Sequence, residues 1–501
     1  MRREARSARS APLLTQPLVA AMLIVAVAIA TRCVTYGNPI VDMDDQFYWM
    51  VGRSMWNGDW PVLDIWDRKP VGLFLIFGAI AGVSSSIIAM QLVATLFAAA
   101  TAWIVRAAAL TFTGAQGATF AALAYLLVLP AFGGQAGQSP VFYNLFMAGA
   151  GALLFRAAGH ESARAIRRDA YWAMLLCGLA LIVKQVSIIE GAYFGLAFLW
   201  LLRRRDEPTR RIVGASALMI GIALLPTLAT FVGYALAGTD AVVAYGYAAY
   251  GSIFAKSSIA VGSRLAGIGY LLLFMLPLLV FAALGAVTRH QSGVHPPRQW
   301  LILGWIIAAV GGYLLIPNFF PHYALPIAVP LAISAASAFD RPGGLLLMTA
   351  TAAFAISMGT VTQLTPNKMA RRDFAAIVRQ VDVARQDGCL YIVNGPVALY
   401  AEVPACRLTP YLFPYHLTLA TETGAVGIDQ RTEVSRILDL RPAIIVTQDK
   451  ERPNHAPTLD KLIDARLATD YLLVLRVAEK AHPAISTLRI WQRKDLRTRQ
   501  R

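Results

Sequence analysis

Long apolar runs recur along the first 360 residues of the chain, and short polar stretches separate them. A helix of about 20 apolar residues spans the roughly 30 Å core of a bilayer. Runs that could form such helices fall near residues 18–30, 86–109, 117–130, 141–157, 172–183, 189–202, 212–237, 266–287, 300–316, 324–339 and 343–363. The pattern predicts a polytopic α-helical membrane protein with about 11 transmembrane helices.

One further apolar run, at 70–83, is too short for a comfortable membrane span. Pro70 suits the first turn of a helix, and the serines at 84–86 end the run. We therefore predict a helix that lies at the outer membrane interface or dips into it.

The pattern changes from residue 366 onward, where apolar runs shorten and charges return. Short β-type runs at 389–394 and 443–447, and a possible hairpin at 471–477 and 485–492, alternate with helical spacing near 374–381, 434–438 and 459–463. This alternation predicts a small α/β domain at 366–501. The transmembrane domain would then be 1–365, with a first outer loop at 37–85.

The net charge of +16 also needs an explanation, because it would suit a protein that binds nucleic acid. Arginines gather before the first run and in the short loops 156–168, 203–211 and 288–299, which is the pattern of cytoplasmic loops. We therefore expect no nucleic-acid partner. The first run is interpreted as an uncleaved span, with a cleaved signal peptide as the alternative.

Alternation of the spans places the loops 131–140, 184–188, 238–265 and 317–323 on the outer face, together with the C-terminal domain. The expected location is the inner membrane of a bacterium, with the N-terminus in the cytoplasm and the C-terminal domain in the periplasm. A disulfide between Cys389 and Cys406 is then allowed, because the periplasm is oxidising. Two separately buried thiols are the alternative.

The strongest chemical signal lies between the first and second runs. Asp42, Asp44 and Asp45 precede an aromatic stretch with helical spacing at 47–56, which predicts an amphipathic helix in the interface plane. The aspartates could simply cap this helix. A second cluster, with Asp67, Arg68 and Lys69, follows after a short turn, and an exposed ion-pair network is its simplest interpretation. Together, however, the clusters could bind a lipid-linked phosphate and supply a general base.

These residues resemble the first outer loop of the GT-C glycosyltransferases, which include the protein O-mannosyltransferases and the aminoarabinose transferase of lipid A. Family members show an Asp-Glu pair, then a tyrosine, and later Lys-Pro-Pro. In this sequence Asp44-Asp45, Tyr48 and Lys69-Pro70-Val71 stand at those places. The similarity is specific over about 35 residues, and the remaining chain agrees in layout.

The resemblance implies a transferase that moves a hexosyl or pentosyl group from a polyprenyl-phosphate donor to a hydroxyl. The acceptor would be a lipid, a glycan or a protein at the periplasmic face. Asp44 would be the base, with Asp45 supporting it, and Arg68 and Lys69 would bind the phosphate. The further candidates for substrate binding in this loop are Asp42, Tyr48 and Asp67.

Other outer loops supply further candidates. Relatives often carry an acidic residue in the loop before the fourth span, but this sequence has none there. Gln138, Tyr143 and Asn144 could bind sugar hydroxyls in its place. Polar residues that satisfy a helix turn are an equal alternative for all three. Lys184 could contact the phosphate or could snorkel to the interface.

Two more outer segments are candidates for contact with the lipid donor. His322 and Tyr323 resemble a pair that precedes this span in relatives, and they would contact the lipid phosphate unless the histidine is structural. Three tyrosines and Lys256 make the 238–265 loop a possible lid over the lipid, although interfacial tyrosines are common.

No cofactor is expected, because no Cys/His spacing suggests zinc and no glycine-rich phosphate loop occurs. An aspartate cluster could still hold a divalent cation. The alternative function is a transporter or flippase of lipid-linked sugars, which should bury charges near the midplane within broken helices. A scaffold or sensor is a third possibility, for which the substitution Asp44→Asn would have no effect.

Overall fold

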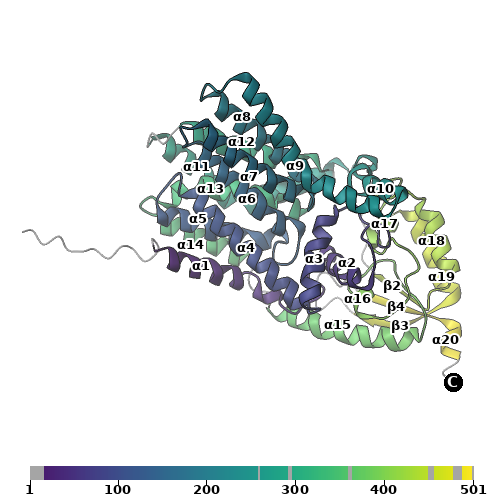
Figure 1. Cartoon of the computed structure of the whole chain (residues 1–501). Helices are drawn as coiled ribbons and strands as arrows, with labels where there is room; N and C mark the ends of the chain where they lie inside the picture. Colours follow the sequence, from purple (N-terminus) through teal and green to yellow (C-terminus); the bar gives the residue numbers. More distant parts are fainter. Residues whose placement is uncertain are drawn as a thin grey trace, which may run out of the picture.

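The computed structural model describes residues 16–257, 260–291, 296–316, 318–358, 364–448, 456–477 and 488–498. A large helical bundle leads into a smaller α/β part that contains the C-terminus (Figure 1). The N-terminal arginines at 2–9, and residues 485–487 of the expected hairpin, lie outside the described residues.

Helices occupy all eleven predicted spans. They are α1 (Pro17–Ala30), α4 (Ile87–Ala109), α5 (Ala115–Val128), α6 (Ser139–Ala157), α7 (Ala163–Leu181), α8 (Ile188–Arg203), α9 (Thr209–Ala237), α11 (Val261–Gln291), α12 (Pro296–Leu315), α13 (Leu325–Phe339) and α14 (Gly344–Ser357). Among the described residues, eight helical segments are long and apolar enough to cross a membrane. The other three, α6, α7 and α14, pack within the same bundle. The chain is therefore a multi-pass helical membrane protein.

Helix α13 forms the centre of this bundle and is buried along its whole length. It packs against α11, α5, α4 and α12. Its sequence is apolar on every side, which is the pattern expected of a helix with no face toward water.

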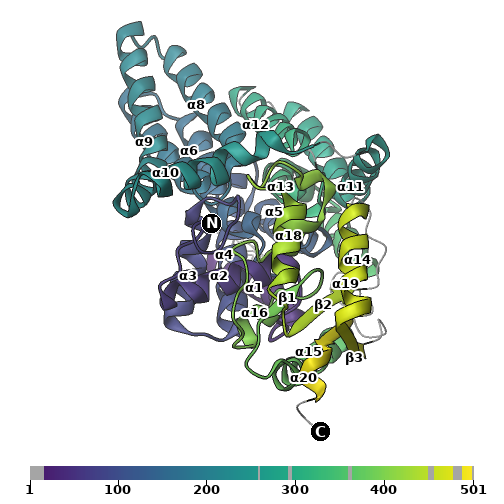
Figure 2. The same ribbon diagram turned by 90° about the vertical axis from the view of Figure 1, so that its right-hand side faces the viewer.

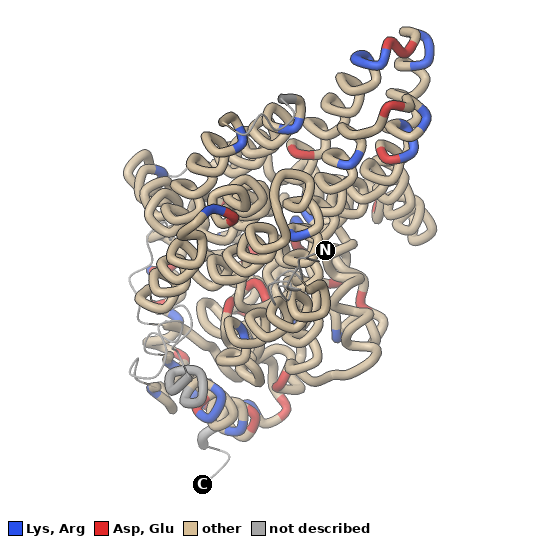
Figure 3. The backbone as a smooth tube through the Cα atoms, turned by 90° about the vertical axis from the view of Figure 1, so that its left-hand side faces the viewer, with Lys and Arg blue, Asp and Glu red and all other residues tan. Residues whose placement is uncertain are grey.

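The predicted cytoplasmic loops meet at one end of the bundle. Arg205 donates to the carbonyl oxygen of His160 at 2.7 Å, and Arg298 lies within hydrogen-bond distance of the carbonyl of Phe155. Figure 3 views the molecule from the side opposite the α/β part: in the bundle, charged positions lie mainly in loops and at helix ends, and the helices themselves are mostly tan. The arginine-rich loops thus share one end of the molecule.

The first outer loop lies at the opposite end, between the bundle and the α/β part (Figure 1). It holds α2 (Met43–Ser54) and α3 (Val71–Val83). Helix α3 has 13 residues, in agreement with the expectation that this run is too short to span. The two helices approach closely at Gly52, where an added Cβ atom would lie 2.6 Å from Cβ of Phe77. Glycine is therefore required at this contact.

Helix α2 differs from the expected helix in the interface plane. Nine of its twelve residues are buried, and Phe47 packs edge-on against Phe74 of α3 and Phe413 of the α/β part. The aromatic side chains therefore face protein rather than lipid. Sequence spacing alone could not distinguish these two environments, because both require apolar side chains.

The α/β part begins with α15 (Leu364–Arg385) and contains a four-stranded sheet in the order β1-β2-β4-β3. Strands β1 (Leu390–Ile392) and β2 (Ile444–Gln448) are parallel, whereas β4 (Leu488–Arg493) pairs antiparallel with β2 and with β3 (Tyr471–Val477). Helices α18 (Gln430–Asp439) and α19 (Pro457–Asp470) occupy the two stretches of predicted helical spacing near 434–438 and 459–463. Helix α20 (Lys494–Thr498) follows β4. Figure 2 brings this part to the front.

Alternate residues of β2 supply the two cores of this part. Ile444 and Val446 pack with Phe374 of α15, while Ile445 packs with Val434 and Ile463 on the other face. This two-residue period is that of a strand covered on both faces. Cys389 and Cys406, the pair considered from the sequence, form a disulfide beside β1.

Short elements complete the connections. They are the helices α10 (Thr239–Gly246), α16 (Leu399–Glu402) and α17 (Pro414–Thr418), the 3-10 turns Cys33–Thr35, Met55–Asn57, Leu129–Phe132, Gln185–Ser187, Ser252–Ala255, Pro321–Ala324 and η9 (Ala420–Glu422), and a π-helical turn at Tyr247–Gly251.

Candidate active site

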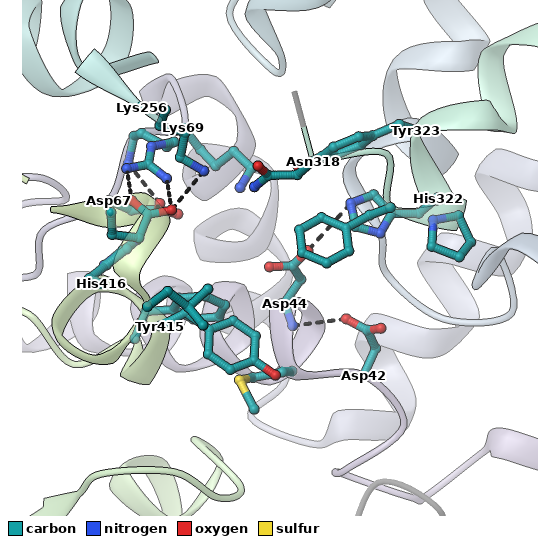
Figure 4. Close-up of a pocket in the computed structure, with 17 residues that line it drawn as sticks. Asp42, Asp44, Asp67, Lys69, Lys256, Asn318, His322, Tyr323, Tyr415 and His416 are labelled. Atoms are coloured by element: carbon teal, nitrogen blue, oxygen red, sulfur yellow. Dashed lines mark hydrogen bonds and ion pairs between the residues drawn. The ribbon is translucent and has the colours of Figure 1, made fainter. Parts of the chain in front are cut away.

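A cavity of about 280 Å³ lies where the first outer loop meets the α/β part. This volume is close to the lower end of small-molecule sites, about 300–1,000 Å³. Residues from five separate stretches of the chain form its walls: Asp42, Met43, Asp44, Asp67, Arg68, Lys69, Lys256, Asn318, Phe320, Pro321, His322, Tyr323, Phe413, Tyr415, His416, Leu419 and Glu422. Figure 4 shows Lys69, Lys256 and Asp67 on one side of the cavity and Asp42 and Asp44 on another.

Asp44 owes its place to the start of α2. Asp42 caps this helix, and its Oδ1 accepts a hydrogen bond from the backbone N–H of Asp44 at 2.9 Å. Asp44 therefore lies in the first turn, where the helix dipole favours a negative charge. Gln138 donates from Nε2 to Oδ2 of Asp44 at 3.2 Å and to Oδ1 of Asp42 at 2.6 Å.

The neighbours of Asp44 favour the ionised form of its carboxyl group, because they lower its pKa. Burial alone would raise its pKa, but Lys69, His322 and Lys184 outweigh burial and lower the pKa below its ordinary value. Nε2 of His322 lies 3.7 Å from Oδ2 of Asp44. A buried carboxylate that stays ionised and faces a cavity can accept a proton from a bound hydroxyl.

The other two aspartates of the cluster behave differently. Burial and the neighbouring charge of Asp44 raise the pKa of Asp42 to about 7. Burial also raises the pKa of Asp45, which lies outside the cavity wall and accepts from the backbone N–H of Gly137 at 3.0 Å. Asp45 thus holds the loop that presents Gln138, and it does not face the cavity.

Arg32 holds the same loop from the end of α1. Its guanidinium donates to the carbonyl oxygens of Gly134 and Ala136, the latter at 2.6 Å. Arg32 is 1% exposed. This buried arginine thus fixes the backbone on which Gln138 stands.

Two lysines lie over aromatic rings near the cavity, and of these two Lys69 belongs to its wall whereas Lys184 does not. Nζ of Lys69 lies 5.4 Å from the ring centre of Tyr48, and Nζ of Lys184 lies 4.1 Å from that of Tyr323. Within the described chain, Nζ of Lys184 has no hydrogen-bond partner although it is buried. Burial and the charge of Lys69 lower its pKa well below the ordinary value.

The remaining cations of the cavity are paired. Arg68 donates to both carboxylate oxygens of Glu422, with Nη1 at 2.9 Å from Oε1, and Nζ of Lys256 lies 2.7 Å from the same Oε1. Arg68 and Lys256 hold the pKa of Glu422 at about 2, against the effect of burial. Glu422 is therefore an ionised carboxylate of the α/β part within the cavity wall.

Asp67 and His416 form a second contact between the two parts of the molecule. Oδ1 of Asp67 accepts from the backbone N–H of Arg68 at 2.7 Å and lies 3.6 Å from Nε2 of His416. Burial raises the pKa of Asp67 and lowers that of His416. Both shifts disfavour the charged forms, so this contact joins groups that tend toward neutrality.

Two of the expected sugar-binding residues lie away from the cavity. Asn144 donates to the carbonyl oxygen of Leu325 at 3.2 Å inside the bundle, and Tyr143 is 1% exposed beside it. Neither belongs to the cavity wall. Both side chains are buried within the bundle, so the structure does not bring Tyr143 and Asn144 to the cavity together with Asp44.

Several wall residues did not emerge from the sequence as site residues. Asn318 follows a span, and Tyr415, His416 and Glu422 come from the α/β part, more than 340 residues after Asp67. The sequence indicates Lys256 only as part of a possible lid over the lipid. A single histidine or glutamate in a soluble segment carries no signal, because only the docking of the α/β part brings it to the cavity.

Unpaired polar atoms indicate that the cavity suits a polar ligand. Among the described residues, Nε of Arg68, Oδ1 of Asn318 and Nδ1 of His416 are buried without a hydrogen-bond partner. Such atoms are rare unless water or a ligand satisfies them. No group of three or more His, Cys, Asp or Glu residues suited to a metal ion occurs in the described part of the chain.

Comparison with solved structures agrees with the fold described above, whereas the sequence comparisons found no match. No protein-family model matches the sequence, and no curated protein sequence matches it significantly. The fold is similar to that of ArnT from Cupriavidus metallidurans bound to undecaprenyl phosphate, with a TM-score of 0.65 and 16% identity, over 95% of this chain and 98% of that chain. The apo state of ArnT gives a TM-score of 0.63 over the same shares.

A more distant neighbour is the oligosaccharyltransferase of Archaeoglobus fulgidus tethered with an acceptor peptide. Its TM-score is 0.52 and its identity 11%, over 86% of this chain and 69% of that chain. These likenesses establish the fold. They confirm the architecture that the resemblance to GT-C glycosyltransferases predicts, over nearly the whole chain.

Proposed function

We propose that the protein is a GT-C-type glycosyltransferase that moves a sugar from a polyprenyl phosphate to a hydroxyl of a lipid, glycan or protein acceptor. The observation that carries the proposal is the single cavity that Asp44 shares with Lys69 and Arg68, and the charge of Lys69 helps to lower the pKa of Asp44 there. The likeness in fold to ArnT, whose structure contains undecaprenyl phosphate, supports a donor of this kind.

The reaction assigns a role to each group. Asp44 takes the proton of the acceptor hydroxyl as its oxygen forms a bond to the anomeric carbon. The bond from that carbon to the phosphate oxygen breaks, and polyprenyl phosphate leaves with the electron pair. Lys69 stabilises the negative charge that develops on the phosphate. The proton leaves Asp44 to the released phosphate or to water.

The cavity faces the periplasm in this proposal, and the membrane is the inner membrane of a bacterium. The support is the distribution of positive charge, because the arginine-rich loops lie at the end opposite the cavity. A donor lipid in the outer leaflet of that membrane could then reach Lys69 from the side.

The reaction is proposed to need no metal ion. Arginine and lysine side chains within the cavity supply the positive charge that a divalent cation would otherwise provide at the leaving phosphate. Activity should therefore persist after incubation with EDTA.

A transporter of lipid-linked sugars is the second candidate. It would need charges near the membrane midplane within broken helices. The charged groups instead gather beside the α/β part, which favours chemistry at the surface over passage through the bundle.

Mass spectrometry of envelope lipids and glycans from a deletion strain tests the proposal. A sugar should be missing from one component, and the wild-type gene should restore it. Asp44→Asn should fail to restore it, whereas the control Asp64→Asn, at an exposed carboxylate of the same loop, should succeed. Restoration by Asp44→Asn would refute the proposed mechanism.

A further inference from the structure

Arg68 and Lys256 share one anion, and the protein itself supplies it. The two oxygens of Glu422 accept from both terminal nitrogens of Arg68, and Oε1 also accepts from Lys256 at 2.7 Å. The side chains of Arg68, Lys256 and Glu422 are 13%, 8% and 4% exposed, respectively. The contact is therefore buried and joins three segments that are distant in the sequence.

This arrangement matches the one in which proteins bind phosphate. A guanidinium offers two parallel N–H groups to two oxygens of an anion, and a lysine adds a point charge. The two buried cations, Arg68 and Lys256, pair with the single carboxylate of Glu422. These three side chains together therefore carry one more positive than negative charge when all are ionised. A phosphate group carries more oxygens than a carboxylate and could satisfy both cations.

We propose that Arg68 and Lys256 form a phosphate subsite of the cavity, and that Glu422 is an internal competitor which the phosphate group of the donor must replace. The inference rests on the proposed function, because the phosphate is that of the lipid-linked donor. It assigns Lys256 to the donor site and gives the α/β part a role in donor binding.

Glu422 is suited to such an exchange by its position. It ends the segment 413–422, whose Tyr415, His416 and Leu419 also line the cavity. Gly424 and Gly427 follow with φ of +77° and +78°, values that favour glycine, so the chain turns sharply directly after this segment. Withdrawal of Glu422 would therefore change the wall of the cavity that also contains Asp44. Binding of the donor phosphate would in this way alter the space in which the acceptor hydroxyl binds.

The opposite role for Glu422 is that of a permanent clamp. In that case the carboxylate would hold Arg68 and Lys256 in position for the phosphate, and its removal would weaken donor binding. The sign of the effect of a Glu422 substitution on affinity therefore distinguishes the two roles.

The experiment measures the affinity of purified, full-length protein for undecaprenyl phosphate in detergent, with undecaprenol as the probe that lacks phosphate. If Glu422 occupies the subsite nine-tenths of the time, its removal should tighten binding by about tenfold. Glu422→Gln should therefore bind undecaprenyl phosphate more tightly than wild type, with no change for undecaprenol. Inorganic phosphate should compete more effectively in this variant if the subsite recognises phosphate itself.

Two variants keep the result interpretable. Glu402→Gln is the matched control, because Glu402 makes a similar ion pair with Arg53 at 2.6 Å but lies outside the cavity. Glu422→Asp keeps the charge and withdraws it by one methylene, so it should also tighten binding if Glu422→Gln does not fold. Lys256→Gln should weaken binding.

Equal or weaker binding by folded Glu422→Gln or Glu422→Asp would overturn the inference. Failure of the proposed function would give a different result. Neither the wild type nor any variant would bind undecaprenyl phosphate, or Lys69→Ala would bind it as tightly as the wild type does.

Discussion

Asp44 and Lys69 come from the same outer loop and line the same cavity, and the charge of Lys69 helps to lower the pKa of Asp44. One residue could activate a hydroxyl, and the other could hold the phosphate that departs. Their proximity links acid–base chemistry to donor binding, because loss of the cation would also change the carboxylate.

This link gives a pH prediction. Lys69 lowers the pKa of Asp44, so Lys69→Gln should raise it, and a higher pH would then be needed to ionise the base. The acid limb of the pH profile of kcat/KM should therefore move to higher pH. Affinity for undecaprenyl phosphate should also fall by about 10- to 100-fold, the range for a charge-assisted hydrogen bond. An unchanged acid limb would show that Asp44 is not the titrating base.

Gln138 should act through Asp44. Its Nε2 donates to the carboxylates of both Asp42 and Asp44, so Gln138→Leu should leave Asp44 less well oriented. We expect kcat to fall by about tenfold or more while KM for the donor stays constant. Combined with Asp44→Asn, the substitution should cause no further loss of activity. An additive loss would indicate a separate role in substrate binding.

Asp42 should influence stability in a pH-dependent manner. Its pKa in the folded protein is about 7, above the ordinary value of 3.8, so the folded state holds a proton that the unfolded chain releases between these values. The contribution of this carboxyl to stability is thus fully present below pH 3.8 and is lost as the pH rises toward 7.

Asp42→Asn removes the titrating carboxyl, so the variant does not lose this contribution to stability as the pH rises. The asparagine keeps a side-chain oxygen that can cap α2. Its unfolding temperature should exceed that of wild type by more at pH 8 than at pH 5, as measured by thermal unfolding in detergent. A difference that shrinks as the pH rises would contradict the assigned titration.

The disulfide should stabilise the α/β part. Its cysteines are 17 residues apart, and closure of a loop of about this length contributes about 3 kcal/mol in the chain-entropy model. Cys389→Ser should lower the free energy of unfolding by roughly that amount. Cys33→Ser, at an exposed free cysteine, should have little effect.

The sequence predicted the fold well where a single pattern decides the structure. Apolar runs placed the helices of the bundle because burial in lipid or protein requires apolar side chains along a whole helix. The short apolar run at 443–447 likewise predicted strand β2, and the structure shows that its residues Ile444 and Ile445 lie in two different cores.

The site was predicted mainly where its residues lie together in the sequence, and in addition at His322 and Tyr323, which the resemblance supplied and which also line the cavity. Asp42, Asp44, Asp67, Arg68 and Lys69 all line the cavity, and they come from one loop. Glu422 and His416 reach the cavity only because the α/β part docks there, and no local pattern encodes that docking. Tyr143 and Asn144 were assigned to the correct end of the bundle, but the rotation of α6 turns them inward.

The most direct test of the central claim is transfer of sugar by purified protein from its polyprenyl-phosphate donor, identified from the deletion strain, to the acceptor. The account predicts that Asp44→Asn loses at least about 100-fold in kcat, as expected for a missing general base, while it still binds undecaprenyl phosphate. Asp64→Asn should retain wild-type activity. Transfer by Asp44→Asn at the wild-type rate would contradict the account.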